Sequence, residues 1–133
     1  MENEVLVEWA KAFVQAVAAQ GPWAEIEPYY APDVSQEEFP NRLLPKGTVR
    51  NLEALREASA KGRKVIKAQT IEIVNAVSSG QCVVLEAIWT GTLAVGFGTL
   101  KPGDQLRARF AQVFEFKDGL IWRQRNYDCF EAW

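Results

Sequence analysis

The sequence contains no histidine and only two cysteines among its 133 residues. The absence of histidine excludes histidine-dependent catalytic triads, imidazole general bases and histidine-ligated zinc. Two cysteines are too few for a structural zinc site, so we predict neither a metal nor another cofactor. Any acid–base chemistry must therefore use aspartate, glutamate, tyrosine, lysine or cysteine side chains.

Long apolar runs and a strong charge of one sign are also missing. No run of about 18 apolar residues could span a membrane, and the acidic start (MENEVLVEW) lacks the basic region of a signal peptide. The net charge of −2, with basic and acidic residues interspersed, indicates no nucleic-acid and no membrane partner. Cys82 and Cys129 lie in predicted strands, so we expect free thiols and a cytoplasmic protein.

The first part of the chain has helical patterning. Length and composition predict one domain over residues 1–133, with 48% apolar residues available for its core. Apolar positions on one face predict a helix over residues 4–20, which Gly21 ends. Pro22 opens a second helix that runs to about Tyr30, so the two helices form a hairpin.

A short strand and a third helix come next. Residues 34–39 have the pattern of a strand, in which alternate side chains share a face, so Gln36 and Glu38 point the same way. A loop then leads to a helix over residues 52–61, and we expect Gly62 to end it. The two polar side chains are therefore expected to lie together near the end of the first strand.

The remainder of the chain has the period of β-strands. Residues 64–78 and 81–93 are typical of strands, and the glycine-rich segment 94–105 is typical of a mobile loop, with Phe97 as a candidate lid. The strand over residues 81–93 is apolar on both faces, which indicates that both faces are covered. We expect helices on one side and a second copy of the chain on the other, giving a homodimer through the outer sheet face.

Residues 110–133 form a final hairpin whose turn permits two registers. A loop of three residues, 117–119, pairs Phe116 with Leu120. It gathers on one face Phe110, Gln112, Phe114, Trp122, Gln124, Asn126 and Asp128, and on the other Arg107, Arg109, Arg123, Arg125, Glu115 and Tyr127. A loop of two residues would instead place Asp128 opposite Arg109 as an ion pair. We favour the longer loop because it places the amides and Asp128 among aromatic side chains.

Helices followed by long antiparallel strands define an α+β fold. The element order, with YAPDVSQEEFP (30–40), VFEFKDGLIWRQRNYD (113–128) and the closing CFEAW, resembles the nuclear transport factor 2-like superfamily, in its SnoaL-like and ketosteroid isomerase-like branch. The resemblance covers essentially the whole chain. It implies a cone-shaped α+β barrel, with a curved antiparallel sheet wrapped around three N-terminal helices and an apolar pocket at the open end. Members are often dimers.

The resemblance also implies roles for individual residues. Isomerases of this branch use a carboxylate near the end of the first strand as a base, and Glu38 matches that position. Their two oxyanion donors correspond here to Val14, which cannot donate a hydrogen bond, and Gln112, which can. SnoaL-like cyclases place an acid on the last strand, which Asp128 resembles, but the histidine that usually assists it is missing. Neither mechanism therefore transfers unchanged.

The candidate catalytic residues are Asp128, Glu38 and Gln112. The candidate ligand-binding residues are Phe13, Trp23, Tyr30, Gln36, Trp89, Phe97, Phe110, Phe114, Trp122, Gln124 and Asn126. A carboxyl group in an apolar cavity has a raised pKa and becomes a usable base near neutrality. The structural alternatives are an ion-paired Asp128, a Glu38 that contacts water or Arg42, and a Gln112 that is only a satisfied buried amide.

Three functions remain open at this point. The first is an isomerase, cyclase or hydratase that performs acid–base chemistry on an apolar carbonyl compound, without a cofactor. The second is a non-catalytic binder of an apolar or aromatic metabolite, and the third is a dimeric protein-interaction module. We favour a pocket protein with a small apolar or aromatic ligand, because amides and carboxylates among aromatic residues suit a ligand-binding cavity.

Overall fold

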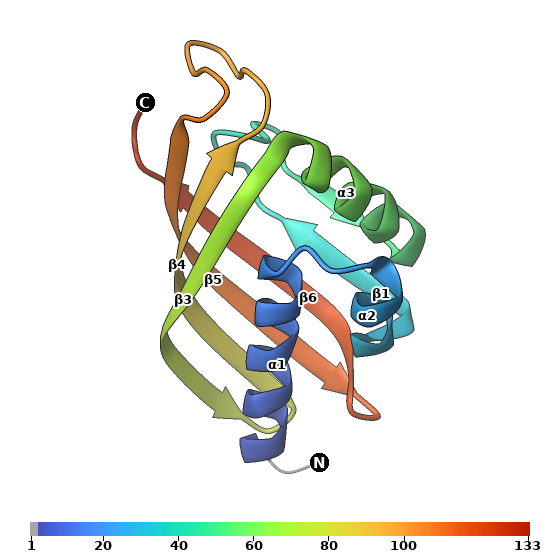
Figure 1. Ribbon diagram of the computed structural model, residues 1–133. Coiled ribbons are helices and arrows are strands. Elements are labelled where there is room, and N and C mark those ends of the chain that lie inside the picture. The colour runs from blue at the N-terminus through green and yellow to red at the C-terminus, as the bar shows by residue number, and fades with distance from the viewer. Residues whose placement is uncertain (1–2) are drawn as a thin grey trace.

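The computed structural model describes residues 3–133 as helices packed against one curved sheet (Figure 1). The helical elements are α1 (Asn3–Ala18), α2 (Trp23–Ile26), the 3-10 turn η1 (Glu27–Tyr29) and α3 (Leu52–Val65). The strands are β1 (Tyr30–Glu38), β2 (Thr48–Arg50), β3 (Ile66–Ser79), β4 (Cys82–Leu93), β5 (Gln105–Lys117) and β6 (Leu120–Phe130). No helix among these residues is both long and apolar enough to cross a membrane.

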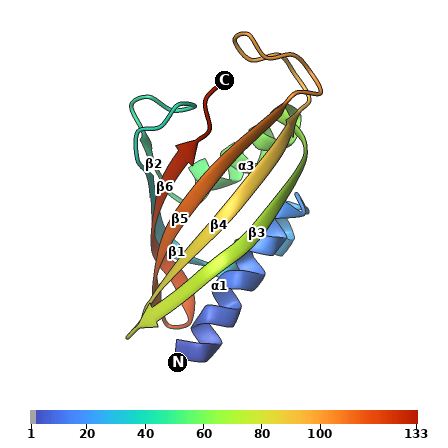
Figure 2. The same ribbon diagram turned by 90° about the vertical axis from the view of Figure 1, so that its left-hand side faces the viewer.

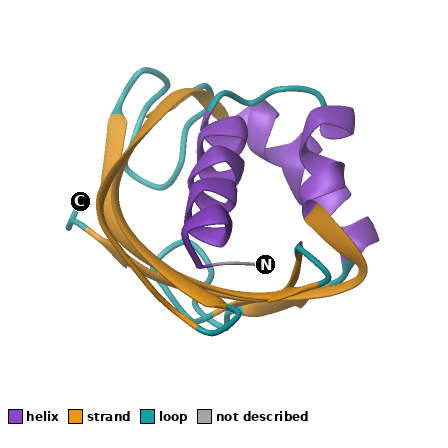
Figure 3. Ribbon diagram, turned by 90° about the horizontal axis from the view of Figure 1, so that it is seen from below, coloured by secondary structure: helices purple, strands orange, loops and turns teal. Residues whose placement is uncertain are grey.

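The six strands form one sheet in the order β2-β1-β6-β5-β4-β3. Seen from below, the sheet bends into an open arc with the helices on its concave side (Figure 3), and Figure 2 shows its outer face. The predicted α+β cone is confirmed. The sheet differs from the expected antiparallel one because β1 pairs in parallel with β6, and because it is not closed. The short strand β2 was not predicted, since three residues carry too little periodicity.

The core lies between α1 and the concave face of the sheet. The helix buries Leu6, Ala10, Phe13 and Val14, and the strands supply Val83, Leu85 and Phe114. The rings of Phe13 and Phe114 meet edge to face, with 5.8 Å between their centroids. Complete burial of such a side chain contributes about 1.5–3 kcal/mol. The helical apolar face read from the sequence therefore fixes α1 across the sheet.

Helix ends depart from the glycine-based expectations. Gln20, not Gly21, adopts the left-handed conformation after α1, with φ of 53°. The predicted second helix is shorter than expected, because its last turn is 3-10 and β1 already begins at Tyr30. The third helix continues through Gly62 to Val65, since Arg63 and Lys64 in its last turn favour the negative end of the helix dipole.

The final hairpin corrects the predicted turn. Lys117 pairs with Leu120, so the loop has two residues, and both have positive φ as a type I′ turn requires: 54° at Asp118 and 77° at Gly119. A bulge at Trp122 then shifts the register by one residue.

The bulge preserves the predicted sidedness of the hairpin despite the shorter turn. Beyond it, Asn126 lies opposite Gln112 and Asp128 lies opposite Phe110, so Asp128 is not paired with Arg109. The two-residue turn and the bulge each shift the register by one residue in the same direction, so the pairing differs from the predicted one by two residues. The amides and the carboxylate therefore share the inner face, as the longer loop predicted.

The arginines of the outer face have more partners than we expected. Arg125 forms an ion pair with Glu115 on the neighbouring strand, and Arg107 lies 3.5 Å from a carboxylate oxygen of Glu131. The guanidinium group of Arg123 stacks 4.1 Å above the ring of Trp122. These contacts lie within one chain, so a second copy is not needed to neutralise them.

Candidate functional site

A cavity of about 270 Å³ lies under α3, between this helix, the end of α1 and the strands β1, β2 and β3. Its lining residues are Val17, Gln20, Trp23, Ile26, Tyr30, Gln36, Glu38, Arg50, Leu55, Ala58, Ser59, Gly62, Arg63, Ile66 and Gln69. About half of these residues are apolar, and the polar ones come from β1, β2, β3, α3 and the segment after α1. This volume lies near the lower end of the roughly 300–1,000 Å³ typical of ligand pockets.

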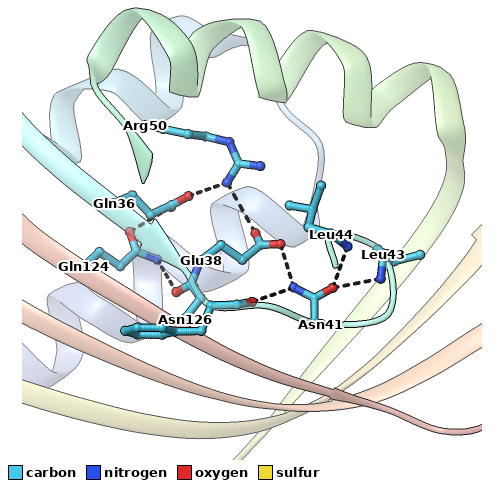
Figure 4. A network of polar contacts seen from close by, with 9 residues as sticks. Gln36, Glu38, Asn41, Leu43, Leu44, Arg50, Gln124 and Asn126 are labelled. Atoms are coloured by element: carbon cyan, nitrogen blue, oxygen red, sulfur yellow. Dashed lines mark hydrogen bonds and ion pairs between the residues drawn. The ribbon is translucent and has the colours of Figure 1, made fainter. Parts of the chain in front are cut away.

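Arg50 and Glu38 form the polar centre of this cavity. Their side chains come from the antiparallel neighbours β2 and β1, and the Arg50 Nη1 atom lies 3.3 Å from Glu38 Oε1 (Figure 4). The same nitrogen donates to Gln36 Oε1 at 3.1 Å. The side chains of Arg50 and Glu38 are only 19% and 17% exposed, so water screens this ion pair less than a surface pair.

A chain of amides continues from Arg50 into the sheet (Figure 4). Gln36 donates to Gln124 Oε1 at 3.2 Å, and Gln124 donates to Asn126 Oδ1 at 3.0 Å. Because arginine can only donate hydrogen bonds, the Gln36 side chain must turn its oxygen towards Arg50. Its NH2 group then donates to Gln124, and Gln124 donates in turn to Asn126. All three amide side chains are buried, so these bonds also remove the cost of burying polar groups.

Glu38 is fixed on its other side by the loop between β1 and β2. Asn41 Nδ2 donates to Glu38 Oε2 at 3.2 Å, while Asn41 Oδ1 accepts from the backbone N–H groups of Leu43 and Leu44. Both carboxylate oxygens of Glu38 thus have donors, and its ion-pair partner is Arg50 rather than Arg42, which was one of the structural alternatives. These contacts hold the Glu38 carboxylate in place between β2 and the β1–β2 loop.

Asp128 has the opposite environment. It lies on the inner face of β6 opposite Phe110, and burial raises its pKa from 3.8 to about 7. The negative charge of Glu38 raises the pKa further, and Arg50 lowers it in part. Asp128 therefore interacts electrostatically with Glu38 and Arg50, although it is not among the residues that line the cavity.

Tyr30 adds a protonated hydroxyl group to the cavity. Burial raises the pKa of this phenol well above its ordinary value, with Arg50 opposing the shift. Its ring packs against Phe13 with 5.2 Å between centroids and stacks on Trp23 at 6.0 Å. Tyr30 therefore remains a neutral hydrogen-bond donor at physiological pH.

The structure brings some of the predicted site residues together and separates others. Trp23, Tyr30, Gln36 and Glu38 line the cavity, and Gln124 and Asn126 connect to it through the amide chain. Phe13 and Phe114 belong to the core under α1. Gln112 is partly exposed on β5 opposite Asn126, outside the cavity lining.

The remaining predicted aromatic residues lie elsewhere. Trp89 and Phe110 stack at 5.7 Å in a second apolar cluster near the end of the sheet. Phe97 is 40% exposed on the loop between β4 and β5, with its ring 6.2 Å from that of Trp133. Trp122 occupies the bulge, where Arg123 and Lys117 contact its ring. None of these four lines the cavity.

Sequence reasoning missed Arg50 and the α3 residues of the cavity. Arg50 belongs to the unpredicted strand β2, and its pairing with Gln36 across two strands has no sequence signal. A detectable sign was that Arg50 directly precedes Asn51, the N-cap residue of α3. Among residues 3–133, no group of three possible metal ligands comes together.

Comparison with known proteins identifies the family. The sequence pattern of the SnoaL-like domain matches residues 10–124, so this chain belongs to the SnoaL-like domain family. No curated protein matches the chain. This membership confirms the predicted branch of the nuclear transport factor 2-like superfamily and supports a small-molecule-binding class of fold.

Solved structures share the fold over nearly the whole chain. IdmH from Streptomyces antibioticus, described as a polyketide cyclase, superimposes with a TM-score of 0.77 at 18% identity, covering 92% of this chain and 91% of IdmH. A SnoaL-like protein from Jannaschia sp. CCS1, also described as a polyketide cyclase, gives 0.75 at 19% identity, covering 95% and 86%. An LEH-like epoxide hydrolase from M. tuberculosis gives 0.75 at 15% identity, covering 98% and 86%. At these identities the likeness establishes the fold alone.

Proposed function

We propose that the cavity binds a small, largely apolar carbonyl compound. We further propose that Asp128, which is not among the lining residues but interacts electrostatically with Glu38 and Arg50, moves a proton on this compound. The observation that supports this proposal is the contrast between the two carboxylates. Glu38 is ion-paired with Arg50, whereas Asp128 interacts electrostatically with both but forms no ion pair within residues 3–133. Arg50 holds Glu38, whereas burial keeps the pKa of Asp128 at about 7. Of the two carboxylates considered from the sequence, Asp128 is therefore the better acid–base group.

The reaction class follows from what these groups can do. Asp128 removes a proton from the carbon beside the carbonyl group, so a C–H bond breaks, an O–H bond forms on Asp128, and the electron pair moves to the carbonyl oxygen. Arg50 contacts Glu38 and Gln36 through Nη1, which leaves other N–H groups to stabilise this oxygen. Gln112 remains a predicted second donor.

The solved relatives are consistent with this chemistry. Two are described as polyketide cyclases and one as an epoxide hydrolase. Closing a ring through a carbanion requires removal of a proton beside a carbonyl group, and opening an epoxide requires a base and an acid. Each of these two reaction classes therefore needs a group that transfers a proton.

The test is proton exchange on apolar ketones. A thermal-shift screen against ketones, lactones and polycyclic aromatics selects ligands, and NMR then follows exchange of the acidic C–H protons of bound ketones in D2O. We expect wild-type protein to accelerate exchange, with a rate that rises with pH through about 7, the pKa of Asp128. Asp128→Asn should lower this rate by about 100-fold or more, the range of one acid–base group.

Glu38→Gln is the matched comparison. It removes the negative charge that raises the pKa of Asp128, so the midpoint of the pH profile should move to lower pH while exchange persists. If ligands stabilise the protein but exchange never exceeds the buffer rate, the chain is a binder and the catalytic proposal fails. If no ligand in the screen raises the melting temperature, the pocket proposal itself fails.

A further inference from the structure

One ridge of α3 becomes more polar as it approaches the rim of the cavity. Leu55, Ser59 and Arg63 follow one another at intervals of four residues, so they lie on the same face of the helix. All three line the cavity, and exposure increases along them from a buried Leu55 to an exposed Arg63. The small residues Ala58 and Gly62 lie beside this ridge and leave open space there, because nothing lies within 4 Å of a Cβ built on Gly62.

Most other polar groups of the cavity already have partners within the fold. Gln69 donates to the backbone oxygen of Val17 and accepts from Trp89 Nε1, so both ends of its amide are occupied. Gln20 donates to the backbone oxygen of Ile66 at 3.1 Å, which leaves its amide oxygen. These two amides join α1 to β3 and are structural.

The groups that remain are mainly hydrogen-bond donors. Within residues 3–133, Arg63 forms no ion pair and no hydrogen bond, and neither do the hydroxyl groups of Ser59 and Tyr30. Arg56, seven residues earlier on the same helix, lies 3.9 Å from Glu53. The charged lining residues are Arg50, Arg63 and Glu38, and Glu38 is paired with Arg50. Arg63 is therefore the cation of the cavity that no carboxylate neutralises.

We propose that the ligand carries a carboxylate in addition to its apolar body, and that Arg63, with the Ser59 hydroxyl beside it, binds this carboxylate at the rim. Arginine donates two parallel N–H groups to a carboxylate, and Ser59 supplies a further donor from one turn away. The apolar body then extends past Leu55 and Trp23 towards Arg50. This inference deepens the proposed function and rests on it for the site, since it specifies the substrate class as an apolar keto acid.

The test compares probes that share one apolar ring system and differ in the charge of the attached polar group. Isothermal titration calorimetry measures the dissociation constants of 2-naphthoate, methyl 2-naphthoate and 2-naphthylmethylammonium with wild-type protein, Arg63→Gln and Arg56→Gln. Arg56→Gln is the matched control, because it removes the same charge from an exposed position on the same helix outside the cavity lining. Low and high salt separate contact from long-range attraction.

We expect wild-type protein to bind 2-naphthoate at least about tenfold more tightly than its methyl ester, as one charge-assisted contact provides. Arg63→Gln should remove this preference without changing the affinity for the ester, and Arg56→Gln should retain it. The inference is overturned if the ester binds as well as the acid, or if both arginine variants lose the preference equally.

The same experiments keep the two proposals apart. If naphthoate binding depends on Arg63 but Asp128→Asn exchanges ketone protons as fast as wild-type protein, the carboxylate site stands and the catalytic proposal fails. If Asp128-dependent exchange is present while charged and neutral probes bind equally, the catalytic proposal stands and the carboxylate site fails.

Discussion

Asp128 shows how one residue can depend on the whole site for its chemistry. The residue lies on β6, yet the two charges that modify its pKa come from β1 and β2. Burial is the largest cause of the raised pKa, since a carboxylate loses hydration when apolar neighbours such as Phe110 replace water. Arg50 limits the effect because it attracts the charged form, and Glu38 adds to it by repulsion.

The raised pKa predicts a particular dependence of stability on pH. The folded protein holds a proton on Asp128 up to about pH 7, whereas the unfolded chain releases it near pH 3.8. Between these values the folded state binds more protons, so this residue's contribution to stability is complete below about pH 4 and is lost as pH rises through 7. The charged form of Asp128 therefore destabilises the fold at alkaline pH.

Asp128→Asn should remove that destabilisation. We expect the variant to gain about 1–2 kcal/mol of unfolding free energy relative to wild type between pH 5 and pH 8, less than the full shift implies because the carboxyl group is partly solvated. Urea denaturation at both pH values measures this difference. A variant whose difference from wild type is the same at pH 5 and pH 8 would contradict the raised pKa.

At the scale of single elements, α3 contains a glycine that lowers the stability of the helix. Gly62 lies inside the helix, where glycine is less favourable than alanine by about 0.5–1 kcal/mol, and it also lines the cavity. Its missing side chain leaves space beside Arg63 at the rim. The helix therefore has lower stability at the position where the cavity is widened.

Gly62→Ala should raise the unfolding free energy by about 0.5–1 kcal/mol and weaken the binding of 2-naphthoate. The added methyl group meets no atom within 4 Å, so no clash offsets the gain in helix propensity. Urea denaturation and calorimetry measure the two effects. Ala60→Gly, at an exposed position on the same helix, is the control and should lower stability without altering affinity. Loss of stability in Gly62→Ala would be the contrary result.

The final hairpin differs from its predicted form in two ways. The favoured turn of three residues was wrong, and the turn has two, yet the inward set of Gln112, Asn126 and Asp128 was placed on the correct face. The bulge at Trp122 inserts one residue into β6 after the turn, and one residue is the shift that exchanges the two faces of a strand. The shorter turn and the bulge together shift the register by two residues, which returns each side chain to its predicted face but gives it a different partner.

At the scale of the whole molecule, the outer face of the sheet carries apolar side chains that the helices do not cover. Val77, Val84 and Val113 lie side by side across β3, β4 and β5 in paired register, and Val77 is 53% exposed. Such an apolar row suits contact with the same face of a second copy. In a dimer with twofold symmetry, the row of one chain would pack against the same row of the other chain. The sequence-based expectation of a homodimer through this face therefore remains our prediction.

Val84→Lys tests this dimer. A charge in the centre of an apolar contact costs desolvation energy without a partner, so we expect a monomer in light scattering coupled to size-exclusion chromatography, where wild type should elute as a dimer. Val49→Lys, on the strand β2 at the other edge of the sheet, is the control and should leave the mass unchanged. A monomeric wild type at micromolar concentration would refute the prediction.

The sequence by itself determined the α+β class, the succession of three helices and long strands, and the sidedness of β4. These features depend on local periodicity, because apolar residues at helical or alternate spacing must face one core whatever lies opposite. The same reasoning placed Glu38 beside Gln36 on β1. It also identified Asp128 as a carboxylate among aromatic residues, which its inward position beside Phe110 agrees with.

Only the tertiary structure decided which of these groups meet. Arg50 reaches Glu38 because β2 folds back on β1. The cavity combines side chains from positions 17 to 69, including several from α3, which covers it. The parallel pairing of β1 with β6 brings Asp128 near that pair from the far end of the chain. Charges interact through distance and local solvation, and neither quantity is encoded by spacing along the chain. For this reason the sequence indicated two carboxylates, and the fold decided that Glu38 is bonded and Asp128 titrates near neutral pH.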